Sequence, residues 1–133
     1  MPEVNNRDPF QEFKKEVERN SKDHTSEFDP QDIKMNCALA AACYVSILFF
    51  LPLLLRPDSK YARFHANQGL VFLIATAVLG IIQKAIPHVP FASGLIGVAF
   101  GLIELGFFLY GFVNTLNGKA KELPFIGGIT LIK

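Results

Sequence analysis

The sequence predicts an all-α integral membrane protein with three transmembrane helices and a polar N-terminal tail. Half of the 133 residues are hydrophobic and only 19% are charged, whereas soluble domains carry about a quarter charged residues. Residues 1–34 hold six of the thirteen Lys and Arg residues and nine of the twelve Asp and Glu residues. The remaining chain contains three long apolar segments, and the net charge of +1 argues against binding nucleic acid through bulk charge.

Residues 1–34 are predicted to form the polar, partly helical tail. Asp8 and Pro9 are suited to begin a helix, and Phe10, Phe13 and Val17 then fall on one stripe at helical spacing. This helix is either amphipathic and lies on the membrane surface, or belongs to a solvated tail. Three apolar residues make a narrow face, which favours the solvated tail.

The first span is predicted over about residues 33–55. Residues 35–55 are uncharged over 21 positions, a length sufficient to cross a hydrocarbon core of about 30 Å. Asp29 is suited to cap this helix and Pro30 to occupy its first position. Pro52 is expected to kink or end the last turn.

The second and third spans are predicted over about residues 64–86 and 94–116, and residues 35–133 would thus form one three-helix domain. Asp58 or Ser59 is suited to cap the second helix, and Pro87 to close it. The short connection between the first two spans predicts a tight antiparallel hairpin. Gly118 is suited to stop the third helix in the left-handed conformation. The last fifteen residues are too short and broken to span, so we expect them at the interface or between helices.

Two motifs resemble a known family. The block from Tyr61 to Leu70 reads YARFHANQGL, and the block from Asn117 to Gly128 reads NGKAKELPFIGG. Together they are similar to small bacterial membrane proteins related to the chloroplast inner-envelope import component (the Tic-twenty-like family), which includes magnetosome membrane proteins. The resemblance covers roughly residues 35–133 and implies a helical integral membrane protein.

The first motif places His65, Asn67 and Gln68 near the membrane boundary. His65 and Gln68 share a helix face, and Asn67 points elsewhere. His65 and Gln68 are suited to bind a partner, a lipid headgroup or the C-terminal tail. The alternative, which we favour, is structural: these polar groups satisfy backbone or neighbouring helix groups.

The third span carries a GxxxG pattern at Gly97 and Gly101. Small residues four apart allow helix backbones to approach closely in lipid. We expect these glycines to contribute to helix contacts, within the bundle rather than between copies.

Glu104 is the only charged residue of the third span, and it shares the face of Gly97 and Gly101. A charged side chain at this depth costs about 3 kcal/mol on insertion scales. We therefore expect a protonated Glu104, hydrogen-bonded to hydroxyl groups at similar depth. The candidate partners are Tyr44, Ser46 and Thr76. This arrangement is a structural clasp or, alternatively, a proton or ion site.

Basic residues near the membrane favour a cytoplasmic C-terminus. With three spans, Arg56, Lys60 and Arg63 would lie on the same side as the basic residues of the tail. The opposite side would hold Lys84 and the N-terminal tail. Against this orientation, translocation of a charged 34-residue tail without a signal sequence is unfavourable.

No catalytic, cofactor or metal constellation stands out. His65 has no second ligand at metal-binding spacing, and no serine lies in a nucleophile elbow. We expect a non-enzymatic, multi-pass protein of the bacterial cell membrane that acts by interaction as an assembly or accessory factor. The alternative is a small oligomeric transporter, channel or lipid-handling subunit. The expected partners are membrane lipids, other membrane proteins or further copies of the chain.

Overall fold

The protein is all-helical, as the sequence predicts. The computed structural model describes residues 8–86 and 91–132, with the side chain of Ser46 left undescribed. Within these ranges the chain forms no β-strand, only an isolated bridge between Asp23 and Lys121. The elements in order are α1 (Pro9–Arg19), η1 (Thr25–Glu27), α2 (Pro30–Ala41), η2 (Ala42–Tyr44), η3 (Ser46–Phe50), α3 (Leu51–Leu55), α4 (Lys60–Ala85) and α5 (Ala92–Leu116).

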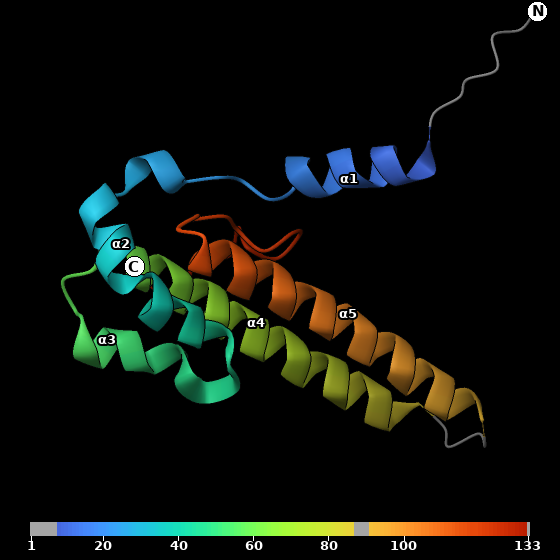
Figure 1. The fold of residues 1–133 in the computed structure, drawn as a ribbon. Helices are drawn as coiled ribbons and strands as arrows, with labels where there is room; N and C mark the ends of the chain where they lie inside the picture. The colour runs from blue at the N-terminus through green and yellow to red at the C-terminus, as the bar shows by residue number, and fades with distance from the viewer. Residues whose placement is uncertain (1–7, 87–90, 133) are drawn as a thin grey trace, which may run out of the picture.

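Within the described residues, α4 and α5 are the two helices long and apolar enough to cross a membrane. They have 26 and 25 residues, which corresponds to about 38 Å of helix each. They run side by side in opposite directions (Figure 1). Three spans are not confirmed, and Pro87, expected to close the second span, lies outside the described residues.

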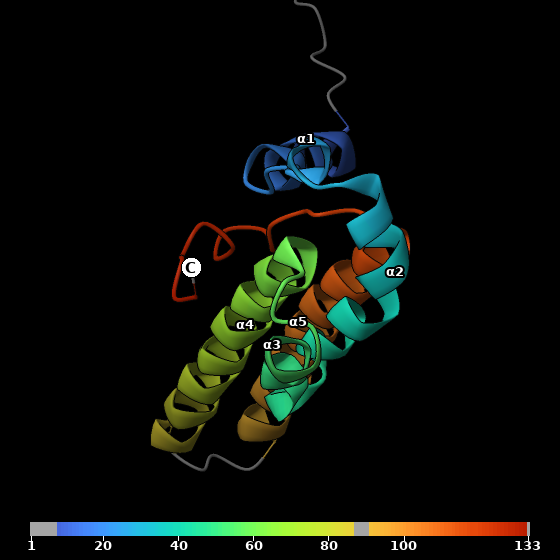
Figure 2. The ribbon, with the colours of Figure 1, turned by 90° about the vertical axis from the view of Figure 1, so that its left-hand side faces the viewer.

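The first apolar segment corrects the prediction of one continuous helix. Helix α2 ends at Ala41, the chain bends at Val45, and two short helices follow. Pro52 lies in the first turn of α3 instead of ending a long helix, because a residue without an N–H group is tolerated there. Helices α2 and α3 thus run in opposite directions beside α4 (Figures 1 and 2).

Both ends of this helical hairpin lie at the same end of α4. Near the start of α2, the Asp32 carboxylate accepts hydrogen bonds from Ser59 Oγ at 2.5 Å and from the Tyr61 N–H at 3.1 Å. The hairpin therefore enters and returns beside the first turns of α4. Twelve residues in α2 give about 18 Å of helix, which is shorter than a hydrocarbon core of about 30 Å.

Helix starts and stops follow local chemistry. The Asp8 and Asp29 carboxylates accept hydrogen bonds from the second residues of α1 and α2, and a proline opens each helix. Ser59 caps α4 through Ala62 N at 3.0 Å. After α5, Gly118 has a φ of 75°, and the flanking N–H groups bond back to helix carbonyls in a left-handed stop.

The buried part of the protein lies at one end. All buried residues of α4 fall between Tyr61 and Val71, and those of α5 are Gly111 and Thr115. We call this end the polar cap: residues 20–28, residues 60–71 and residues 117–132. The remaining parts of the long helices, residues 72–85 and 92–110, form the membrane body. None of the body's described residues is buried.

The N-terminal tail is only partly separate from the fold. Helix α1 buries no residue, and Phe10 and Phe13 are 67% and 61% exposed. Residues 20–28, in contrast, lie against the tail after α5 (Figure 2). The His24 N–H donates to Ala120 O at 2.8 Å, and the Glu122 N–H donates to Lys22 O at 2.9 Å.

Candidate functional site

His65 lies at the centre of the polar cap and is fully buried. Its Nε2 lies 3.1 Å from Lys119 O, and its Nδ1 lies 2.7 Å from the Tyr44 hydroxyl. A carbonyl only accepts, so Nε2 carries the proton and Nδ1 accepts from Tyr44. Thr115 Oγ1 lies 3.1 Å from the same Nδ1 and donates to Gly111 O at 2.6 Å. His65 thereby connects the hairpin, α4, α5 and the tail.

Tyr61 and Asp32 tie the same elements together from the outer side. The Tyr61 hydroxyl donates to the carbonyls of Thr115 and Lys119, at 2.9 and 3.1 Å. Burial works to raise the pKa of Asp32, but hydrogen bonds from Ser59, the Tyr61 N–H and Asn36 outweigh it and hold that pKa below its usual range. The ionised Asp32 thus anchors the hairpin.

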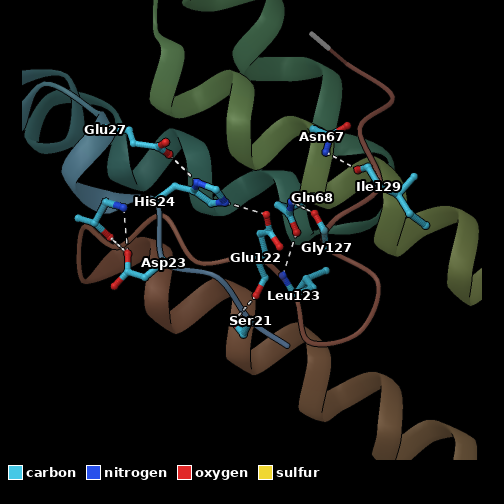
Figure 3. A network of polar contacts seen from close by, with 11 residues as sticks. Ser21, Asp23, His24, Glu27, Asn67, Gln68, Glu122, Leu123, Gly127 and Ile129 are labelled. Atoms are coloured by element: carbon cyan, nitrogen blue, oxygen red, sulfur yellow. Dashed lines mark hydrogen bonds and ion pairs between the residues drawn. The ribbon is translucent and has the colours of Figure 1, made fainter. Parts of the chain in front are cut away.

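Asn67 and Gln68 bind the backbone of the C-terminal tail (Figure 3). Asn67 Nδ2 donates to Ile129 O at 2.8 Å, and its Oδ1 accepts from the backbone N–H groups of residues 131 and 132. Gln68 Nε2 donates to Gly127 O at 2.8 Å, and its Oε1 accepts from Leu123 N at 2.9 Å. Of the roles considered for this motif, the structure thus shows binding of the tail.

His24 lies between two carboxylates at the surface of the polar cap (Figure 3). Its Nε2 is 2.7 Å from Glu122 Oε1, and its Nδ1 is 2.5 Å from Glu27 Oε2. The hydrogen bond with Glu122 is the largest cause that raises the pKa of His24, and the bond with Glu27 adds to it against partial burial. This group was not visible in the sequence, because Glu122 is 98 positions from His24.

The predicted intramembrane clasp is corrected for Tyr44, which bonds to His65 rather than to Glu104. Tyr44 lies beside His65 because the first segment bends at Val45 and does not continue as one helix. Thr76 and Glu104 do line one groove of about 370 Å³ between α4 and α5. Thr76 Oγ1 donates to Leu73 O at 2.8 Å, and no hydrogen bond joins it to Glu104 among the described residues. The Ser46 side chain lies outside the described part of the protein.

The glycines that permit the closest contacts are not those of the GxxxG pattern. A Cβ built at Gly101 would meet nothing within 4 Å, and one at Gly97 would meet the end of the Gln83 side chain at 2.7 Å. In contrast, a Cβ at Gly69 would lie 2.0 Å from Cys43 O, and one at Gly111 would lie 2.3 Å from the Tyr44 ring. In the sequence, the only sign of the close contact at Gly69 was its position directly after the HANQ block, residues 65–68.

Among the described residues, no group of three or more His, Cys, Asp or Glu side chains is placed to hold a metal ion. The polar atoms of the motif side chains are hydrogen-bonded to the chain itself. The hydrogen bonds of His65, Asn67 and Gln68 therefore hold the backbone of the C-terminal tail in place beside α4.

The sequence is similar to several known membrane proteins. The magnetosome magnetite crystal formation protein family (MamF/MmsF) matches residues 30–132. Magnetosome protein MmsF of Paramagnetospirillum magneticum is 35% identical over 94 residues, which cover 68% of this chain and 81% of that protein. A UPF0132 membrane protein of Methanocaldococcus jannaschii is 31% identical over 94 residues, which cover 67% of this chain and 79% of that protein.

A Tic20 family protein, Ycf60 of Cyanidioschyzon merolae, is 28% identical over 71 residues, covering 50% of this chain and 36% of that protein. No solved structure matches the chain. The family match begins at residue 30. Residues 20–28, which lie against the C-terminal tail and include His24 and Glu27, are therefore outside it.

Proposed function

The chain belongs to the magnetosome magnetite crystal formation protein family, and from this premise we propose that it is a non-enzymatic assembly or accessory factor that acts through its polar cap. Some relatives are named magnetosome proteins, whereas others carry only a membrane-protein or Tic20 name. The proposal is therefore limited to a role that all of them can share. That role is to present an ordered polar surface at a membrane.

One observation carries this proposal. The motif side chains His65, Asn67 and Gln68 direct their polar atoms to the protein's own backbone and side chains. They hold a C-terminal tail whose outer surface includes Phe125, Ile129 and Leu131, each at least half exposed. An ordered, partly apolar loop on a rigid support is typical of an interaction surface.

We further propose two spans, α4 and α5, with the α2–α3 hairpin returning to its own side of the membrane. Hydrogen bonds join residues 20–25, the start of α4 and residues 119–122, and three spans would separate the N-terminal tail from the C-terminal tail. With two spans, the basic residues of both tails and of residues 56–63 lie on one side, opposite Lys84. The positive-inside rule then favours a cytoplasmic polar cap.

The experiment is site-specific photocrosslinking in native membranes. A photoreactive residue replaces either Phe125 of the polar cap or Leu102 of the membrane body, which are 60% and 65% exposed. We expect discrete protein adducts from position 125 and lipid adducts from position 102. Protein adducts from position 102 alone would contradict the proposal.

A second candidate function is favoured by the groove that holds Glu104 and Thr76. An ionisable side chain at membrane depth is typical of transport pathways. Two spans enclose no pathway, so transport would require several copies. Ion or proton flux into liposomes that contain only this protein, abolished by Glu104→Gln, would favour a transporter or channel over the accessory role.

A further inference from the structure

A polar hollow of about 460 Å³ lies on the surface of the polar cap. Helix α4 contributes Lys60, Arg63 and Phe64 to its lining, and residues outside α4 contribute Glu27 and Glu122. The C-terminal tail adds Thr130 and Ile132. The hollow therefore has a cationic lining from α4 and an acidic lining from outside α4.

The two cations on α4 are available to a ligand. Lys60 and Arg63 are three residues apart on one helix face and exposed. Among the described residues, the ion pairs of the polar cap involve His24, and none of them joins Lys60 or Arg63 to a carboxylate. Lys and Arg side chains form strong charge-assisted hydrogen bonds with phosphate oxygens.

The acidic lining is ordered by His24, which bridges Glu27 and Glu122. Glu27 is 63% exposed, and its Oε1 atom takes no part in the His24 contact. An exposed carboxylate oxygen of this kind is suited to accept hydrogen bonds from a primary ammonium group. The hollow is thus lined by two positive side chains, by the exposed Glu27 and by Glu122, which is 14% exposed, with His24 between the two carboxylates.

The hollow lies at the level of lipid headgroups. Leu70, near the start of the apolar run of α4, is seven residues beyond Arg63, about 10 Å along the helix. Headgroup layers extend about 5–7 Å beyond the hydrocarbon, and a long arginine side chain reaches that depth. On the neighbouring flank, Leu55 lines a hollow with Lys60 and is 59% exposed, so apolar surface reaches the same level.

From this geometry we propose that the hollow binds the headgroup of an ethanolamine-type phospholipid. Lys60 and Arg63 bind the phosphate, Glu27 and Glu122 accept from the ammonium group, and Ile132 and Phe64 contact the adjoining glycerol and acyl carbons. The inference requires only that α4 is embedded in a membrane. It does not depend on the accessory role, whose crosslinking test leaves these four charged residues unchanged.

The test uses the full chain in detergent micelles, with bound lipid counted by native mass spectrometry. The probes are dioleoylphosphatidylethanolamine, dioleoylphosphatidylglycerol and water-soluble phosphorylethanolamine. The double variant K60Q/R63Q should weaken binding of both lipids by about thirtyfold, since each cation near a membrane surface contributes about fivefold. The control K14Q/K15Q removes the same charge from exposed positions of α1 and should leave binding unchanged.

The acidic lining is tested separately. Glu27→Gln should lower the preference for the ethanolamine lipid over the glycerol lipid by about fivefold, with little effect on the glycerol lipid itself. Equal losses in the two double variants would show binding by general charge and overturn the site. Equal affinity for both lipids in the native protein would overturn the ammonium assignment, and equally tight binding of phosphorylethanolamine would overturn the lipid as ligand.

Discussion

The two halves of α4 follow different rules although they belong to one uninterrupted helix. Residues 61–71 are mostly buried, and their polar side chains bind the hairpin, α5 and the tail. Residues 72–85 have no buried member, and Ile74, Val78 and Ile81 are 46–69% exposed. Lipid can cover the second half, whereas the buried polar groups of the first are satisfied by hydrogen bonds within the protein.

This difference indicates where the fold is determined. In the polar cap, each buried hydrogen-bonding group requires a particular partner, so the arrangement is specific. In the membrane body, lipid tails are as apolar as the side chains they replace, so few contacts are required. Substitutions that compare the two halves should therefore have very different effects.

The largest difference is expected between Gly69→Ala and Gly80→Ala. A Cβ at position 69 would lie 2.0 Å from Cys43 O, a backbone atom, whereas one at position 80 would meet nothing within 4 Å. Gly69→Ala should lower the free energy of unfolding by about 3 kcal/mol through overpacking. Gly80→Ala should be neutral or should raise it by up to about 1 kcal/mol through helix propensity.

Unfolding of both variants in mixed micelles with increasing SDS, followed by circular dichroism, measures these changes. Equal effects at positions 69 and 80 would show that the hairpin does not contact α4 as described.

A second pair, Gln68→Leu and Gln83→Leu, compares amide side chains in the two halves. Gln68 binds Leu123 N and Gly127 O, and leucine leaves both tail groups without that partner. We expect a loss of about 2 kcal/mol and faster proteolysis of the tail. Gln83 is exposed, and its replacement should change the free energy of unfolding by less than about 0.5 kcal/mol. A tail that remains resistant to protease in Gln68→Leu would contradict its role as an anchor.

These comparisons also show what the sequence could reveal. The helical class, the caps at Asp29 and Ser59 and the stop at Gly118 depend on neighbouring residues, and such local chemistry is visible in a sequence. The first apolar segment was predicted as one continuous helix because length and hydropathy are the same for a single long helix and for a hairpin that packs on a helix. The bend at Val45 directly follows Tyr44, which bonds to His65, 21 positions away, and no local pattern encodes that contact.

The candidate site divides in the same way. His65, Asn67 and Gln68 were visible as polar residues at the edge of an apolar run. The hollow between Lys60 and Glu122 forms only when the tail returns to α4, so its residues were not grouped by sequence.

A smaller effect is expected from a change of pH on the stability of residues 20–28, which lie against the C-terminal tail. His24 faces Glu27 and Glu122, and Lys60 and Arg63 line the same hollow. Because the pKa of His24 is raised in the folded state, its contribution is complete below its unfolded pKa of about 6.5 and is lost as pH rises through the folded value.

Hydrogen exchange of residues 20–28 should therefore be faster at pH 9 than at pH 6, after correction for intrinsic rates. His24→Gln should remove that difference. Exchange of the membrane body serves as the internal control, and an unchanged pH dependence in His24→Gln would rule out the histidine as its source.

The smallest effect is expected at Glu104 in the membrane body. It is partly exposed in a groove and accepts no hydrogen bond from Thr76. Glu104→Leu should change the free energy of unfolding by no more than about 0.5 kcal/mol, in contrast to the substitutions in the polar cap. A loss of 2 kcal/mol or more, rescued by Glu104→Gln, would instead indicate a structural clasp.

The most direct test of the two-part architecture is the sidedness of single cysteines in intact membranes. In a C37A/C43A background with retained helicity, Ser26→Cys, Asp58→Cys, Lys121→Cys and Lys84→Cys are labelled with a membrane-impermeant maleimide from each side. We expect positions 26, 58 and 121 to react from one side and position 84 from the other. Labelling of position 58 from the side opposite to position 26 would mean that the first apolar segment crosses the membrane, and would contradict the polar cap as described.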